Sequence, residues 1–184
     1  MRKYLPIVIL FTAVFGMLSF YIAREVIASI TKKADVDVVV MDKSKELWFQ
    51  NFADKDLDKN PIVLKDIKAP LVLINFWASW CGPCLKEFPE LIELRKKISE
   101  KSLYIVGINC DDEKPKEKIA SIEKKFDLNF PNILDPENKN LAAVGASTLP
   151  VTLLYHKGVL IYSSFKQTNF LDKKFLEMIQ SAKP

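Results

Sequence analysis

Apolar and polar positions are unevenly distributed along the chain, and the first long apolar run stands apart from the rest. Residues 5–23 carry no charged side chain. As a helix with a rise of about 1.5 Å per residue, this run spans about 29 Å, close to the ~30 Å thickness of the hydrocarbon core of a bilayer. The run is therefore long enough to cross a membrane once.

The residues after this run decide between a cleaved signal and an anchor. Basic residues precede the run, as in a secretory signal, but a cleavable apolar region usually has about 7–15 residues and ends in small ones. The bulky Tyr21 lies two positions before Ala23, and the better cleavage candidate, residues 26–28, follows two charged residues. We therefore predict an uncleaved membrane anchor over residues 1–30, with cleavage or a merely buried helix as the alternatives.

Basic residues flank the run almost equally on both sides, so the positive-inside rule decides little about orientation. A short charged tail remains inside more readily than a large domain. We expect a single-pass protein of the cell membrane whose domain lies on the extracytoplasmic, periplasmic side. Residues 31–45, polar and charged around a short valine-rich run, are expected to be a tether with at most one strand.

The remaining residues, 46–184, have the pattern of an α/β domain. Residues 71–76 are almost wholly apolar and β-branched or aromatic, which is typical of a strand covered on both faces at the centre of a sheet. Apolar residues at helical spacing follow Cys84. The other expected elements are strands at 47–52, 61–67 and 103–108, helices at 115–126, 136–144 and 171–179, and a hairpin of 151–155 with 159–162. A β-α-β half followed by a β-β-α half predicts a mixed central sheet flanked by helices.

Composition excludes several classes of function. The 184 residues allow one domain with an appendage, and 49% apolar with 27% charged residues is ordinary for a chain that buries a core. The net charge of +4 is too small to indicate a nucleic-acid partner. With three Cys and one His, a four-ligand zinc site would need all of them. We therefore expect no metal and no cofactor.

The candidate chemistry is a dithiol in the segment Trp80-Cys81-Gly82-Pro83-Cys84. At the junction between the predicted strand and helix, Cys81 would lie at the helix N-terminus, where free N–H groups and the helix dipole favour the thiolate. We predict that Cys81 is the nucleophile and that the less exposed Cys84 resolves the mixed disulfide. Half of a zinc site and a structural disulfide are the alternatives. Neither explains Trp77 and Trp80, the Gly-Pro insert and the buried strand together.

This segment resembles thioredoxin, and three further segments are similar to the membrane-anchored thioredoxin-like thiol-disulfide oxidoreductases of the TlpA/ResA type. They are residues 60–67, Lys86-Glu87-Phe88-Pro89, and residues 150–158. The likeness covers about residues 46–183 and implies a thioredoxin fold. It also implies a reductant outside the cytoplasm that acts on proteins with Cys pairs, such as apocytochrome c, and that a membrane electron donor recharges. An oxidase or a general disulfide exchanger of exported proteins is the alternative.

The resemblance also implies roles for residues around the dithiol. It places a cis Leu149-Pro150 bond opposite the dithiol, with Leu149 and Pro150 turned toward a bound substrate strand and Trp80 as substrate-facing surface. Asn75 stands where thioredoxin has a buried Asp, so deprotonation of Cys84 needs another acceptor. The resemblance implies Glu87, for which the alternative is an exposed helix acid.

Two residues remain outside this scheme. Cys110 follows the predicted strand at 103–108 and matches no family position; we expect a buried, inert thiol whose pKa is raised by Asp111 and Asp112, with a resolving or regulatory thiol as the alternative. His156 raises the possibility of a copper chaperone, in which two Cys and a distant His bind the metal. Such proteins usually space the Cys differently and lack a Pro at position 150. We therefore expect His156 on the hairpin surface.

Overall fold

The computed structural model describes residues 15–25 and 43–182, which belong to two separate units. Residues 15–25 form a helix whose large apolar side chains are exposed. Among the described residues, no helix has the length and apolar character to cross a membrane. The rest of the predicted anchor, and the tether with its possible strand, lie in residues 1–14 and 26–42, outside the described part of the chain.

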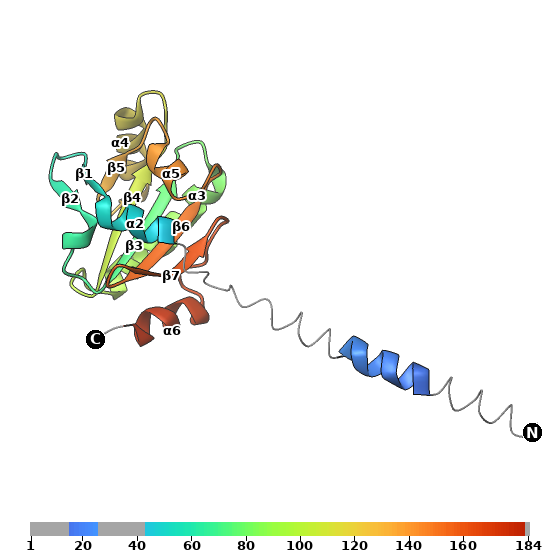
Figure 1. Cartoon of the computed structure of the whole chain (residues 1–184). Helices are drawn as coiled ribbons and strands as arrows, with labels where there is room; N and C mark the ends of the chain where they lie inside the picture. Colours follow the sequence, from blue (N-terminus) through green and yellow to red (C-terminus); the bar gives the residue numbers. More distant parts are fainter. Residues whose placement is uncertain (1–14, 26–42, 183–184) are drawn as a thin grey trace, which may run out of the picture. The chain divides into compact units, whose positions relative to one another are not determined.

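A five-stranded mixed sheet forms the framework of the domain (Figure 1). In spatial order its strands are β5 (Asn132–Leu134), β4 (Leu103–Asn109), β3 (Leu71–Trp77), β6 (Val151–His156) and β7 (Val159–Ser164). The strands β3, β4 and β5 are parallel, whereas β6 runs antiparallel to β3 and to β7. The central place of β3, buried at every position, confirms the prediction made from its apolar run.

Helices cover both faces of this sheet. They are α2 (Lys43–Asn51), α3 (Gly82–Lys97), α4 (Pro115–Phe126), α5 (Lys139–Ala143) and α6 (Lys173–Ser181). Alternate residues of β3 point to opposite faces. Leu71 and Leu73 pack in the core cluster that contains the apolar residues of α3, α4 and α6, and Ile74 and Phe76 pack in the cluster that contains those of α2 and α5.

The structure differs from the prediction in two respects. Residues 47–52, expected as a strand, lie mostly in the helix α2, in which the buried Lys45 and Phe49 are four residues apart on one face. Phe49 packs on Tyr155 with ring centroids 4.3 Å apart, and the Tyr155 hydroxyl donates to the Lys45 carbonyl at 3.0 Å. A short apolar run does not distinguish a helix from a strand, so this packing decides.

The second difference concerns short strands. The segment 61–67 contains β2 (Pro61–Val63), which pairs with β1 (Ala53–Lys55), and a 3₁₀ turn at Leu64–Asp66. The edge strand β5 was not predicted; it is only three residues long and is defined by its pairing with β4. Such elements are too short for a periodic pattern.

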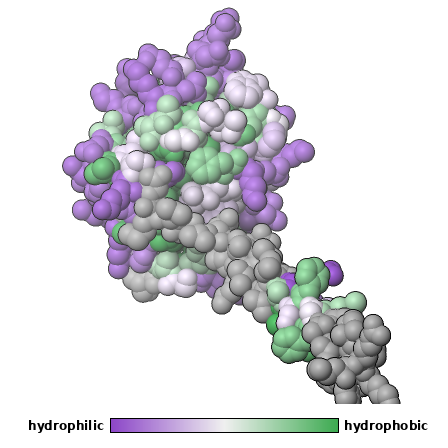
Figure 2. Space-filling view, turned by 45° about the vertical axis from the view of Figure 1, so that its right-hand side comes forward, coloured by the Kyte–Doolittle hydropathy of each residue, from purple (hydrophilic) through white to green (hydrophobic). Residues whose placement is uncertain are grey.

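Hydrophilic residues cover much of the domain surface that Figure 2 shows, and hydrophobic residues gather over part of it. The exposed large apolar side chains of the domain are Leu47, Trp80, Val159 and Phe165. Of these, Trp80 has the largest exposed fraction, 67%, and directly precedes Cys81. Scattered apolar side chains are normal on a protein surface. Trp side chains are, however, highly buried on average, so the exposure of Trp80 beside the dithiol is unusual.

Candidate functional site

Three strand ends meet at one edge of the sheet and build the site. Trp77, at the carboxyl end of β3, pairs with Asn109 at the carboxyl end of β4. Phe76 pairs with Val151, the first residue of the antiparallel β6. The segments that follow β3 and β4, and the one that precedes β6, therefore leave the sheet at the same edge.

The dithiol lies where β3 passes into α3. Cys81 is the N-cap of α3; its backbone N–H donates to the Ala78 carbonyl at 3.1 Å, and its Sγ accepts from the backbone N–H of Cys84 at 3.2 Å. The Gly-Pro pair fits the first helical turn, where a Pro removes an N–H that has no intrahelical partner. The sulfur of Cys81 thus lies against the positive end of the helix.

Cys81 and Cys84 are joined as a disulfide, with their Cα atoms 5.3 Å apart, so the structure represents the oxidised form. Cys84 is fully buried and Cys81 is only 4% exposed. The sequence suggested that Cys84 is less exposed than Cys81, but in the oxidised form the difference between them is small. The assignment of Cys81 as nucleophile depends instead on its position at the helix start.

Asp111 holds the loop that leads into the dithiol, a role that was not predicted from the sequence. Its carboxylate accepts from the backbone N–H and the hydroxyl of Ser79, at 2.9 and 2.8 Å, and from Asn109 Nδ2 at 2.8 Å, while Lys118 Nζ lies 3.5 Å away. Burial alone would raise the pKa of Asp111, but the hydrogen bonds from Asn109 and Ser79, with Lys118, hold it below its ordinary value. The sequence did contain one signal for this role: Asp111 follows the buried strand β4, which lies beside β3.

Trp80 and Leu149, both predicted to contact substrate, line a single cavity of about 520 Å³. Other lining residues come from α5 and from the segment before β6. The Leu149-Pro150 bond is cis, as the family resemblance implied. Since Pro150 directly precedes β6, it lies at the same edge of the sheet as the disulfide. Contact of Trp80, Leu149 and Pro150 with a substrate remains a prediction.

Cys110 also lines this cavity, but its thiol is poorly suited to nucleophilic chemistry. It is 3% exposed and forms no disulfide. Burial, followed by the charges of Asp135 and Asp111, raises its pKa to about 12. This agrees with the expectation of a buried, inert thiol. The causes of the raised pKa differ in part from those expected, because burial and Asp135 contribute and Asp112 does not.

Glu87 is fully buried, which overturns the alternative of an exposed helix acid. Its Oε1 accepts from the backbone N–H of Thr168 at 2.6 Å, and its Oε2 accepts from Asn75 Nδ2 at 3.0 Å. Burial raises the pKa of Glu87 to about 7, although both hydrogen bonds lower it. Glu87 lies three residues after Cys84, so both side chains lie on one face of α3. A carboxyl that titrates near neutrality thus lies one helical turn from the buried sulfur.

The structure does not bring together the ligands of a copper site. His156 pairs with Leu71 at the start of β3, whereas the disulfide follows the end of this strand at Trp77. Six residues of strand separate these positions by about 20 Å. Among the described residues, no group of three or more His, Cys, Asp or Glu side chains could hold a metal ion. His156 is half-buried on the hairpin.

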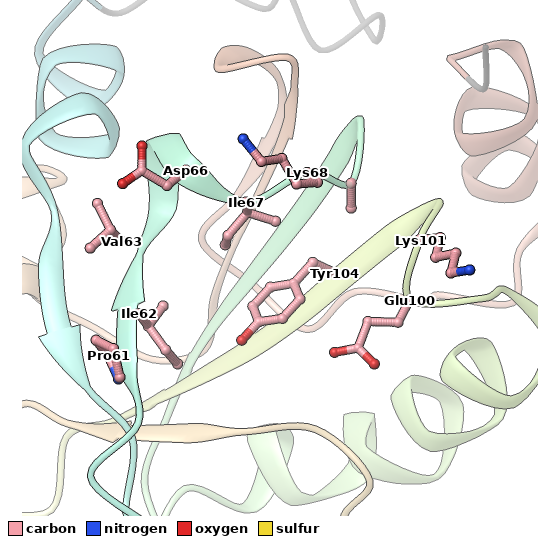
Figure 3. Close-up of a pocket in the computed structure, with 10 residues that line it drawn as sticks. Pro61, Ile62, Val63, Asp66, Ile67, Lys68, Glu100, Lys101 and Tyr104 are labelled. Carbon is pink, nitrogen blue, oxygen red and sulfur yellow. The ribbon is translucent and has the colours of Figure 1, made fainter.

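Another cavity, of about 570 Å³, lies at the opposite end of the sheet (Figure 3). Tyr104 extends into it from the start of β4, near Ile62, Ile67 and Glu100. Burial, together with the charges of Glu100 and Asp56, raises the pKa of Tyr104 to about 12. This cavity contains no thiol and is separate from the dithiol edge.

Comparisons with known proteins agree with the chemistry of this edge. Residues 48–163 match the AhpC/TSA family. Two relatives named thiol-disulfide oxidoreductase ResA are similar to this chain. The one from Bacillus cereus is 36% identical over 107 residues, 58% of this chain and 61% of the relative, and the one from Bacillus thuringiensis is 34% identical over 131 residues, 70% and 75%.

Solved structures show the same fold. A putative thiol:disulfide interchange protein DsbE from Chlorobium tepidum superposes with a TM-score of 0.63 at 23% identity, covering 71% of this chain and 92% of that one. StoA from Bacillus subtilis superposes with a TM-score of 0.58 at 21% identity, covering 70% and 93%. The mixed sheet with helices on both faces is therefore the thioredoxin-like fold.

Proposed function

Because this chain belongs to the AhpC/TSA family and to the ResA-type thiol-disulfide oxidoreductases, we propose that it exchanges the Cys81–Cys84 dithiol with disulfides of other proteins. The observation that carries the proposal is the disulfide itself, closed across the first turn of α3 at the edge where the Trp80 cavity opens. A thiolate of Cys81 has the positive helix end beside it, and the adjacent Trp80 is exposed and lines the cavity.

The exchange runs in two steps. The Cys81 thiolate attacks one sulfur of the substrate disulfide, forms a mixed disulfide and releases the first substrate thiolate. Cys84 then loses its proton and attacks the Cys81 sulfur, which closes the disulfide seen in the structure and releases the second substrate thiolate. Glu87 takes the Cys84 proton, since its pKa of about 7 lets it both accept and return a proton near neutrality.

The direction we propose is reduction of the substrate. The Gly82-Pro83 insert is the one found in thioredoxin, whose potential is about −270 mV against about −120 mV for DsbA. A gap of ~150 mV corresponds to roughly 7 kcal/mol in a two-electron exchange, enough to set the direction. Equilibration of the full chain with glutathione measures this. A potential above about −180 mV would refute the reductant and favour the oxidase.

The proposed substrates are exported proteins with Cys pairs, such as apocytochrome c, met on the extracytoplasmic side of the cell membrane. The uncharged run of residues 5–23 supports a membrane anchor, and a domain outside the cytoplasm would need a membrane electron donor to recharge its dithiol. A reporter active only after export, fused to the C-terminus, is expected to be active. A silent export reporter alongside a working cytoplasmic one would contradict the orientation.

The division of labour between the thiols is tested by trapping. Cys84→Ser leaves the attacking thiol intact and removes the resolving one, so this variant accumulates mixed disulfides with its substrates. Cys81→Ser is the matched control and traps none. Equal trapping by the two variants would overturn the assignment. Acid quench and alkylation of intact cells measure the thiol state of Cys81 and Cys84. This state reports the direction of electron flow, because a mostly reduced pair indicates a reductant.

A further inference from the structure

Asn75 links the central strand to the proposed proton acceptor and has one polar atom without a partner. It is fully buried on β3, and its Nδ2 donates to Glu87 Oε2 at 3.0 Å and to Thr152 Oγ1 at 3.4 Å. Its Oδ1 is buried and has no hydrogen-bond partner within the described structure. Buried polar atoms are nearly always paired, so an orphaned acceptor beside a titrating carboxyl indicates a second arrangement of this amide.

We propose that Asn75 is a positioning residue that serves Glu87 in both of its protonation states. The Asn75 amide donates to the Glu87 carboxylate, as in the structure, and turns by half a rotation about χ2 when Glu87 gains a proton. Oδ1 then accepts from the new O–H of Glu87. The inference rests on the proposed function, in which Glu87 receives the Cys84 proton.

The proton and the electrons balance in this scheme. The Cys84 thiol gives its proton to Glu87 Oε2, and the Cys84 thiolate donates an electron pair to the Cys81 sulfur of the mixed disulfide. The Cys81–Cys84 bond forms, the bond from Cys81 to the substrate breaks, and the substrate sulfur leaves with the displaced electron pair. Glu87 then returns its proton to the solvent, and the Asn75 amide turns back.

The neighbours of Asn75 allow both orientations. After the turn, Oδ1 occupies the position that Nδ2 holds now, within reach of the Glu87 O–H and of the Thr152 hydroxyl, which can rotate to become a donor. Nδ2 takes the position in which Oδ1 has no partner at present. Because one amide atom is unpartnered in either orientation, the turn adds no further unpaired group.

The type of residue at position 75 determines this behaviour. An Asp would place a second carboxyl about 3 Å from Glu87, and the two acids would then titrate as a coupled pair. A Leu of similar size would offer Glu87 neither a donor nor an acceptor. The Asn75 amide can donate to the carboxylate and, once turned, accept from the acid, without adding a charge of its own.

The electrostatic surroundings of Glu87 are simple. Glu90, on the same helix, is the charged group that acts on it, and its charge raises the pKa of Glu87. Within the described residues, β3, β6 and the segment after β7 present to Glu87 and its amide partner the uncharged Asn75, Thr152 and Thr168. The hydrogen bond from Asn75 lowers the pKa of Glu87 toward its value of about 7.

The kinetic test is Asn75→Leu in the full chain. Asn75→Leu removes the hydrogen bond to both forms of Glu87, and because the bond to the charged carboxylate is the stronger of the two, the pKa of Glu87 rises. A rise of about one unit would reduce the ionised fraction at pH 7 from about one half to about one tenth. We expect release of the mixed disulfide to slow about five-fold at pH 7 and to recover at higher pH, while formation of the mixed disulfide is unchanged. Glu90→Gln keeps the Asn75 amide and removes a negative charge near Glu87, so it should lower the midpoint of the pH profile of mixed-disulfide release. An unshifted Asn75→Leu profile would overturn the inference.

Glu87→Gln separates the two hypotheses. If this variant keeps the wild-type pH profile of release, Glu87 is not the acceptor and the proposed route of the proton fails. If it flattens the profile and Asn75→Leu leaves the midpoint in place, only the inference about Asn75 fails.

The turn itself is followed in the wild-type protein by NMR of the Asn75 side-chain amide, which decides the question even if Asn75→Leu does not fold. As Glu87 is protonated, the Nδ2 protons should lose the downfield shift that a carboxylate acceptor gives them. Amide protons that keep this shift while the Glu87 carboxyl titrates would show that the amide does not turn, and would refute the proposal.

Discussion

Replacing Asp111 by Asn removes the charge that holds the loop before the dithiol while it keeps the shape of the side chain. In the native protein the carboxylate receives hydrogen bonds from Ser79 and Asn109 and the charge of Lys118. An Asn side chain offers one acceptor oxygen, and its NH₂ group would face groups that are themselves donors. Each hydrogen bond to a charged group is worth about 1.5–3 kcal/mol. Because Ser79 and Lys118 can regain part of this from water, we expect Asp111→Asn to reduce the free energy of unfolding by about 2–4 kcal/mol.

The pH dependence of this loss has a definite sign. The native pKa of Asp111 is lowered from its ordinary value, which is about 3.9 in an unfolded chain. Its ionisation therefore stabilises the fold above about pH 4, and this contribution disappears as the pH falls through the lowered native pKa. The difference in stability between wild type and Asp111→Asn should be full at pH 7 and should shrink below pH 4.

Urea unfolding of the oxidised chain, followed by Trp fluorescence at pH 7 and near pH 3, measures this difference. Asp112→Asn is the matched control, because Asp112 is the adjacent exposed acid and should leave stability nearly unchanged. In the reduced protein, Asp111→Asn should also slow mixed-disulfide formation, since Ser79 lies two residues before Cys81. If Asp111→Asn lost the same free energy of unfolding at both pH values, the Asp111 charge would not be what stabilises the loop.

Three further changes test other parts of the site and core. Trp80→Ala should raise the KM for a protein disulfide without changing reduction of a small disulfide, because Trp80 is exposed and lines the cavity rather than touching the buried sulfur; equal effects on both substrates would contradict this. Cys110 of the reduced protein should be alkylated at neutral pH only on unfolding, because it is buried and burial raises its pKa to about 12; rapid alkylation of Cys110 in the folded protein would refute its inert state. Gly107→Ala should cost about 1–3 kcal/mol in urea unfolding, because the added methyl meets the Asn132 oxygen that accepts from Trp77 Nε1; wild-type stability would show that the side chain moves aside freely.

The central features of the fold could be predicted from local patterns. The run 71–76 indicated a buried central strand because both faces of β3 are apolar over a long stretch, and Pro115–Phe126 was predicted with the bounds it has. The helix α2 and the strand β5 could not be predicted in this way. Their identity depends on packing and pairing with segments distant in the sequence, such as Phe49 on Tyr155.

The same distinction applies to the site. The disulfide follows from two Cys three residues apart at a strand-to-helix junction, which is a local pattern. The burial of Glu87 does not, since the N–H that binds its Oε1 belongs to Thr168, 81 residues further along the chain. The role of Asp111 likewise appears only when β4 is placed beside β3, so that its carboxylate meets Ser79.

Asp111 and Glu87 show how the surroundings of two buried acids near one disulfide assign them different tasks. Asp111 receives three hydrogen bonds and has a cation beside it, so its pKa is lowered despite burial, and it is ionised at neutral pH. Glu87 receives two hydrogen bonds and has the charge of Glu90 nearby, so burial prevails and its pKa rises to about 7. A permanently charged acid is suited to holding a loop, and an acid that titrates at neutrality is suited to moving a proton. The number of donors and the sign of the neighbouring charge therefore separate the structural carboxylate from the one proposed to serve Cys84.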